Sequence, residues 1–182
     1  MKQIKLGAIC AAFMILLGSC SKEVSNPNDE NEHEAINKIE LVFAETGGAT
    51  TSFIMEDPDG DGGNPPSRID TIKINNNKQY NVTVKIYNIA NGVVKDVSAT
   101  VLMQATSHEF YFIPSGVSVT IQKTDKDKNG YPIGFLSTWQ TSNAGTGSIL
   151  FKLMHKTALK GPNDGPNVGH SDIQLNLPIT IK

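Results

Sequence analysis

The sequence predicts an all-β protein built on a single antiparallel β-sandwich of the immunoglobulin-like type. Apolar residues alternate with polar ones in short runs, for example over residues 80–86 and 173–181. Clusters of Gly, Pro, Asn and Asp separate the runs, and no long window keeps a helical stripe. A period of two is typical of strands half buried against a core, and frequent turn residues favour a sandwich or a barrel.

The strand candidates are the runs in which the alternation is most regular. Pro178 lies on the outward parity of the last run, and a proline has no amide hydrogen to donate, so this strand is expected at an edge or at a bulge. The runs are residues 39–43, 80–86, 117–121, 149–153 and 173–181.

The N-terminus predicts a lipoprotein signal peptide. Lys2 and Lys5 precede an apolar run over residues 6–17 that is too short to span a bilayer. Leu17-Gly18-Ser19-Cys20 then matches a bacterial lipobox, with small residues directly before the cysteine. We therefore divide the chain into a signal peptide (1–19), an acylated Cys20 with a disordered acidic tether (20–34), and a sandwich domain (35–182).

Acylation of Cys20 predicts a durable membrane anchor. Each buried methylene of an acyl chain such as palmitate adds roughly 0.8 kcal/mol of membrane affinity, so two or three chains hold the protein in the bilayer. The alternative is a secreted protein in which Cys20 is incidental. The acidic tether that follows Lys22-Glu23 is similar to the export tag of surface lipoproteins in Bacteroidota-type bacteria. This predicts display at the cell surface of the outer membrane, with the periplasmic face as the alternative.

Charge and cysteine content exclude two classes of function. Sixteen Lys and Arg against eighteen Asp and Glu give the chain a net charge of −2. Residues 1–19 contain two lysines and no acid, so the chain from Cys20 onward is near −4. We expect no nucleic-acid partner, because nucleic acids bind basic faces. Cys10 leaves with the signal peptide, so the domain has neither a disulfide nor cysteine chemistry.

Two loops carry acids at alternate positions. Asp57, Asp59 and Asp61 lie in a D-x-D-x-D-G run, and residues 125–130 form a D-x-D-x-N-G run. Oxygen ligands at alternate positions before a glycine can bind a hard cation, so the first loop is a candidate Ca²⁺ site. Neither loop has the acid that an EF-hand needs at its twelfth position, and the alternative is a turn that closes a hairpin. We expect acids that lie close together only in these loops, where solvent reaches them.

Three histidines of the domain are candidate ligands for Zn²⁺ or Cu²⁺. His155 has the parity of the apolar residues 149–153, so it is expected at the end of an inward-facing row. His108 begins another strand candidate, and His170 ends a Gly/Pro-rich loop beside Asp172. Convergence of the three imidazoles at one rim would form a site, with Asp172 as an oxygen ligand or hydrogen-bond acceptor. The alternative is three separate histidines, and Lys156 and Lys160 are expected to oppose a cation.

No arrangement of residues indicates catalysis. The sequence has no nucleophile elbow, no phosphate-binding glycine loop and no CxxC pair, so the protein is predicted not to be an enzyme. Trp139, with Phe135 and Tyr131 on one run, is interpreted as part of the core rather than as a carbohydrate platform.

The order of several motifs resembles a family of small Bacteroidota-type outer-membrane lipoproteins that are often encoded beside TonB-dependent receptors. Some members carry a type 1 periplasmic-binding-fold label. The likeness extends from Ile36 to the C-terminus and depends on residues 57–63, 124–134, 145–155 and 169–173. Members of the family commonly have an acidic run before the histidine that matches His108, whereas residues 104–107 are neutral here. His155 is flanked by Met154 and Lys156 where the family often has an arginine and an acid.

The resemblance implies a non-enzymatic surface lipoprotein that assists a TonB-dependent receptor, with metal-ion uptake as the expected role. The alternative is an adhesin that binds carbohydrate or protein through the loops of the sandwich. Genes beside this one would separate the two, because a receptor with a histidine-rich loop favours metal and polysaccharide-degrading enzymes favour glycan.

Overall fold

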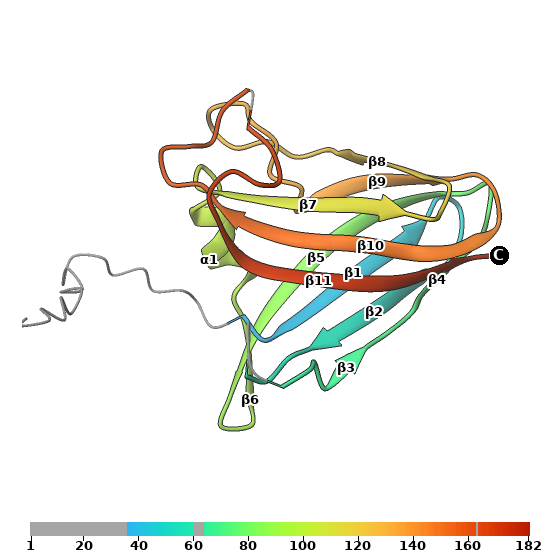
Figure 1. Ribbon diagram of the computed structural model, residues 1–182, viewed down its shortest axis with the longest axis horizontal. Coiled ribbons are helices and arrows are strands. Elements are labelled where there is room, and N and C mark those ends of the chain that lie inside the picture. The colour runs from blue at the N-terminus through green and yellow to red at the C-terminus, as the bar shows by residue number, and fades with distance from the viewer. Residues whose placement is uncertain (1–35, 60–63, 163) are drawn as a thin grey trace, which may run out of the picture. The chain divides into compact units, whose positions relative to one another are not determined.

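The computed structural model describes residues 36–59, 64–162 and 164–182 (Figure 1). Within these ranges the chain is all-β, and two sheets pack as a sandwich, which confirms the predicted fold class. Cys20, the remainder of the tether and Asp61 lie outside the described residues.

The first sheet has the strand order β3-β2-β1-β5-β9-β8, and β6 pairs with the end of β5. Every pair in it is antiparallel. Its strands are β1 (Lys38–Glu45), β2 (Thr50–Glu56), β3 (Arg68–Ile69), β5 (Gln79–Ala90), β6 (Val93–Asp96), β8 (Val119–Lys123) and β9 (Leu136–Thr141).

The second sheet has the order β4-β11-β10-β7. β10 pairs antiparallel with both neighbours, but β4 and β11 run parallel, which departs from a purely antiparallel sandwich. The departure arises because the chain passes from β3, at the edge of the first sheet, to the edge of the second, instead of turning back in a hairpin. The strands are β4 (Ile72–Ile74), β7 (His108–Ser115), β10 (Gly145–His155) and β11 (His170–Ile181).

The buried residues of the core alternate along the strands, as the period of two in the sequence predicts. In β5 every second residue from Tyr80 to Ile86 is buried, and its neighbours are more exposed. Trp139 is fully buried at the centre, with its ring 5.0 Å from that of Phe43 and 5.4 Å from that of Phe112, both edge-on. Each large apolar side chain buried in this way contributes roughly 1.5–3 kcal/mol. The interpretation of Trp139 and Phe135 as core residues is confirmed.

One short helix, α1 (Ser98–Met103), precedes β7. Val101 of the helix and the preceding Val97 are buried, whereas Met103 is exposed, so the helix covers one end of the sandwich. A turn over residues 104–107 then leads into His108. In the part of the chain that the structure describes, no helix has the length and apolar character needed to cross a membrane.

The outer face of the second sheet is covered at the end where β10 finishes. Lys152, Met154 and Lys156 point away from the core by parity, yet all three are buried. The loops that follow β8 and β10 lie at this end of the sandwich, together with α1 and the start of β7 (Figure 1). This end therefore holds two groups of polar side chains, one on each face of the sheet.

Candidate metal centre

Two neighbouring strands bring two of the candidate histidines together. His155, the last residue of β10, lies opposite His108, the first residue of β7, in the strand register. Both have the inward parity of their strands. The two imidazole rings stack with centroids 4.6 Å apart and planes inclined by 15°.

His108 is held in one tautomer by the backbone. Its side chain is buried, and Nδ1 lies 3.1 Å from the carbonyl oxygen of Gln104. A carbonyl can only accept, so Nδ1 carries the hydrogen and donates it. Nε2 is then the nitrogen that can accept a proton or a metal, and it lies 3.4 Å from Oδ2 of Asp172. A histidine that donates its second N–H to a carbonyl is typical of metal ligands.

A β-bulge brings Asp172 to the histidines. Leu153 of β10 pairs with Ile173 of β11, but the next residue, Met154, pairs with Ser171, so Asp172 is the extra residue of the bulge. A bulge re-aims the side chain of its extra residue. Here the Asp172 carboxylate reaches Nε2 of His108.

The distances within this cluster fit a metal site in part. One ligand atom from each of His108, His155 and Asp172 lies within 4.8 Å of the other two. Ligand atoms 2.0–2.1 Å from a tetrahedral ion are about 3.3–3.5 Å apart, which matches the 3.4 Å between His108 and Asp172. Stacked rings cannot both aim a nitrogen at one ion, so binding requires one ring to turn. His155 is the less buried ring, and its Nε2 lies 2.7 Å from the hydroxyl oxygen of the neighbouring Thr157.

His170 lies in the same cross-strand row but does not join the cluster. It is opposite His155 in the register of β10 and β11, and its side chain is exposed. Gly169 before it has φ +91°, and a Cβ there would lie 2.2 Å from the His155 carbonyl oxygen, so only glycine fits this close approach. The predicted meeting of three histidines is thus seen for His108 and His155, with Asp172 in the third place.

Lys156 does not face the histidine cluster, contrary to the expectation that it opposes a cation there, and Lys160 is paired with an acid. Lys156 follows His155 directly and therefore points to the opposite face of the sheet. Its Nζ lies 2.9 Å from both Glu109 and Asp164. Nζ of Lys160 lies 3.0 Å from Oδ2 of Asp127, and both side chains are buried. Each ammonium is neutralised by an acid.

Glu109 organises the outer-face cluster, which we define as Glu109, Tyr111, Lys123, Lys156 and Asp164. Glu109 is buried and pairs with both lysines, and the Lys156 ammonium also donates to the Tyr111 hydroxyl. Burial, and then Glu109, raise the pKa of Tyr111, which keeps the phenol protonated at neutral pH. Burial lowers the pKa of Lys123 despite its partner. The cluster corrects the expectation that close acids lie only in solvated loops.

The first acidic loop is only partly described. Asp57 follows β2, and its amide donates to the Asn37 carbonyl at 2.8 Å. Oδ2 of Asp59 accepts hydrogen bonds from the backbone amide and from Nδ2 of Asn64, at 2.7 and 2.9 Å. These bonds lower the pKa of Asp59. Ca²⁺ binding by Asp57, Asp59 and Asp61 stays a prediction.

The second acidic loop is a turn closed by its own acids. Oδ1 of Asp127 accepts hydrogen bonds from the amides of Asn129 and Tyr131, at 2.9 and 3.0 Å. Asp125 accepts in the same way from Gly134 and Leu136. Burial favours a higher pKa for Asp127, but the hydrogen bonds from Lys160 and from the two amides lower it overall.

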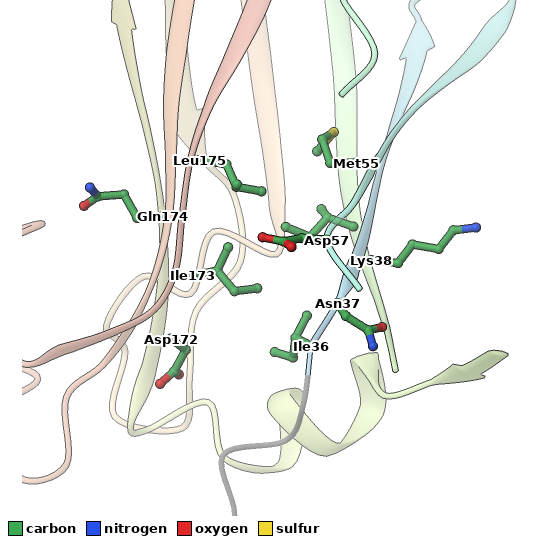
Figure 2. Close-up of a pocket in the computed structure, with 10 residues that line it drawn as sticks. Ile36, Asn37, Lys38, Met55, Asp57, Asp172, Ile173, Gln174 and Leu175 are labelled. Atoms are coloured by element: carbon green, nitrogen blue, oxygen red, sulfur yellow. The ribbon is translucent and has the colours of Figure 1, made fainter. Parts of the chain in front are cut away.

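A cleft adjoins the cluster where the two sheets open (Figure 2). Asp172 lines it together with residues at the start of β1, at the end of β2 and along β11. Asp57 also lines the cleft, so one acid of the predicted Ca²⁺ loop lies near a residue of the histidine cluster, a proximity that the sequence alone did not indicate.

Sequence reasoning missed the partners that orient the histidines. The carbonyl of Gln104 and the hydroxyl of Thr157 carry no sequence signature. The parity of Glu109 and Lys156, each one residue after a candidate histidine, is the sequence signal that could have placed them on the opposite face. Comparison with family models, with curated proteins and with solved structures finds no match to this chain.

Proposed function

We propose that this protein is a non-enzymatic, lipid-anchored outer-membrane protein that binds a borderline divalent metal ion, Zn²⁺ or Cu²⁺, through His108, His155 and Asp172. The observation that carries the proposal is the grouping of one ligand atom from each residue within 4.8 Å of the others. Two imidazoles and one carboxylate are the donor set that Zn²⁺ and Cu²⁺ accept.

The position of the cluster suits reversible binding. His108 is buried and oriented by the Gln104 carbonyl, whereas His155 and Asp172 are only partly buried. An ion therefore has a route from solvent, and three protein ligands leave a fourth position for water or for a donor from a partner. Such a site fits transfer of a metal ion to a TonB-dependent receptor, the partner class that the sequence resemblance implies.

A cluster without a metal is the competing explanation. Protonated His108 would pair with Asp172, and stacking against His155 would complete a structural contact at the rim. The two explanations differ in their response to added metal, because only the first predicts saturable binding that requires neutral imidazoles.

Calorimetry with Zn²⁺ and with Cu²⁺ at pH 7 tests the proposal. We expect one site per chain, a loss of affinity of about 100-fold in His108→Ala and in His155→Ala, and little change in His170→Ala. Binding should weaken strongly near pH 5, because protons compete with the metal ion for the imidazole nitrogens. The His170→Ala variant is the matched control, because His170 lies in the same cross-strand row.

Three results would contradict the metal proposal. They are the absence of saturable binding, equal losses in His108→Ala and His170→Ala, and an affinity that does not change between pH 7 and pH 5. Ca²⁺ is the hard-cation control and should not compete for this site.

The anchor is tested separately. Cys20→Ala removes the thiol that accepts the diacylglyceryl group, so the variant should leave the membrane fraction, whereas the unaltered protein stays there after a high-salt wash. Retention of the variant in washed membranes would show that something other than acylation at Cys20 holds the protein.

A further inference from the structure

β11 has an open edge along its first half. β4 pairs with it only over Ile72–Ile74, opposite Ile179–Ile181. Among the described residues, no strand pairs with the β4 side of β11 between His170 and Pro178. An unpaired edge presents backbone N–H and C=O groups to an added strand.

The hydrogen bonds at the C-terminal end of β11 show which of its backbone N–H and C=O groups face the β4 side. The Lys182 amide donates to the Ile74 carbonyl, and the Lys182 carbonyl accepts from the Asn76 amide, so the backbone of residue 182 faces the β4 side. Alternate residues of a strand face the same neighbour. Gln174 and Asn176 therefore direct their N–H and C=O groups toward the open edge. Pro178 shares this direction, so its missing N–H removes no hydrogen bond to β10, as expected for a proline at an edge.

The cleft lies directly beside this edge. Figure 2 shows Ile173 and Leu175 of β11 pointing toward the side of the cleft formed by Ile36 and Met55, whereas Gln174 points away. The cavity volume is about 40 Å³. A water needs roughly 10–15 Å³, so the space has room for about one inserted side chain.

The charged groups at the cleft select the chemistry of its occupant. Asp57 and Asp172 supply two carboxyl groups to its lining. Lys38, its one basic lining residue, already pairs with Glu56 at 2.9 Å. A basic group on the occupant therefore has complementary charge, and an acidic group does not.

We propose that the open edge of β11 binds an extended peptide segment of a partner protein as an added strand, in line with β4. Backbone hydrogen bonds form at Gln174 and Asn176, one apolar side chain of the segment enters the cleft, and a lysine or arginine of the segment lies near Asp57. Strand addition of this kind derives affinity from the main chain and specificity from side-chain pockets. The proposal does not depend on metal binding.

The test uses residues 20–182 with Cys20→Ala, in the presence of EDTA, and a short synthetic peptide that alternates valine with threonine and carries one lysine. We expect saturable binding by fluorescence anisotropy, with chemical-shift changes at the amides of Gln174 and Asn176. A peptide that is N-methylated at alternate backbone nitrogens should bind at least about tenfold more weakly, because it cannot complete the ladder.

Two protein variants locate the binding. Gln174→Pro removes one edge amide without removing a hydrogen bond to β10, and should weaken binding about tenfold, whereas Gln174→Ala keeps the amide and should bind normally. Asp57→Asn should weaken the lysine peptide but not a lysine-free one. Circular dichroism and the thermal midpoint confirm that each variant is folded.

Other outcomes would overturn the proposal. These are no binding at millimolar peptide, equal binding by Gln174→Pro and Gln174→Ala, or equal binding of the N-methylated peptide. Sedimentation that shows a dimer disrupted by Gln174→Pro would assign the edge to a second copy of this chain instead. Because EDTA is present throughout, these results are independent of the metal site.

Discussion

At the rim of the second sheet, neighbouring residues form a histidine cluster on the inner face and ion pairs on the outer face. His108 and His155 point inward, and Glu109 and Lys156, one residue later on the same strands, point outward. On the outer face Lys123 and Lys156 each have an acid as a partner, so these charges satisfy one another. On the inner face all three clustered side chains are metal-ligand types. Proximity of charged groups alone therefore does not indicate a binding site, because a cluster whose ammonium and carboxylate groups are paired with one another is structural.

The largest effect is expected on the outer face. Lys156→Met removes an ammonium that lies 2.9 Å from both Glu109 and Asp164 and leaves two carboxylates without it. Loss of one partner from a buried ion pair costs about 3–5 kcal/mol, so urea unfolding should show a decrease of this size. Zn²⁺ affinity of the folded variant should fall much less than in His108→Ala, since the substituted side chain lies on the other face.

Lys78→Met is the matched control for this prediction. Lys78 pairs with Glu45 at 2.7 Å, but its side chain is about half exposed, so its loss should have a small effect on unfolding. If Lys156→Met and Lys78→Met had the same free energy of unfolding, water would reach the outer-face cluster as it reaches Lys78. The proposed difference between the two faces of the sheet would then be wrong.

Alternation predicted the faces of the strands but not which strands are neighbours. The parity of residues 149–155 placed His155 on the inward row, and the structure has it there. Its pairing with His108 depends on the order β11-β10-β7, which contacts between distant parts of the chain decide. The bulge at Asp172 could not be predicted, because it depends on a one-residue difference between two strands.

Lys156 shows that adjacency in sequence is a poor guide to electrostatics within a strand. It follows His155 directly, but successive residues of a strand point to opposite faces, so its ammonium lies on the other side of the sheet. The same period that placed His155 inward also placed Lys156 outward. The covering of that outer face was not predictable, because the loops that bury it belong to chain segments without periodic pattern.

The smallest effect on stability is expected at the first acidic loop. Asp59 of this loop is exposed to solvent, unlike the buried Glu109 of the outer-face cluster. Its Oδ2 already accepts two hydrogen bonds from Asn64, so Ca²⁺ must displace these donors to use that oxygen. We therefore expect a weak site, and millimolar Ca²⁺ near its Kd should raise the melting temperature by about one to two degrees.

Asp59→Ala should abolish that small rise. The variant also loses the acceptor for Asn64, so its melting temperature should be slightly lower at neutral pH even without Ca²⁺. A pH series separates the loss of Ca²⁺ binding from the loss of the hydrogen bonds to Asn64. The lowered pKa of Asp59 means that its carboxylate stabilises the fold above its ordinary pKa near 4, and that this contribution disappears as the pH falls through the lowered value. The variant and the unaltered protein should therefore converge in acid. Absence of any Ca²⁺ shift in the unaltered protein, with this acid convergence intact, would identify the loop as a turn alone and restrict metal binding to the inner face of the second sheet.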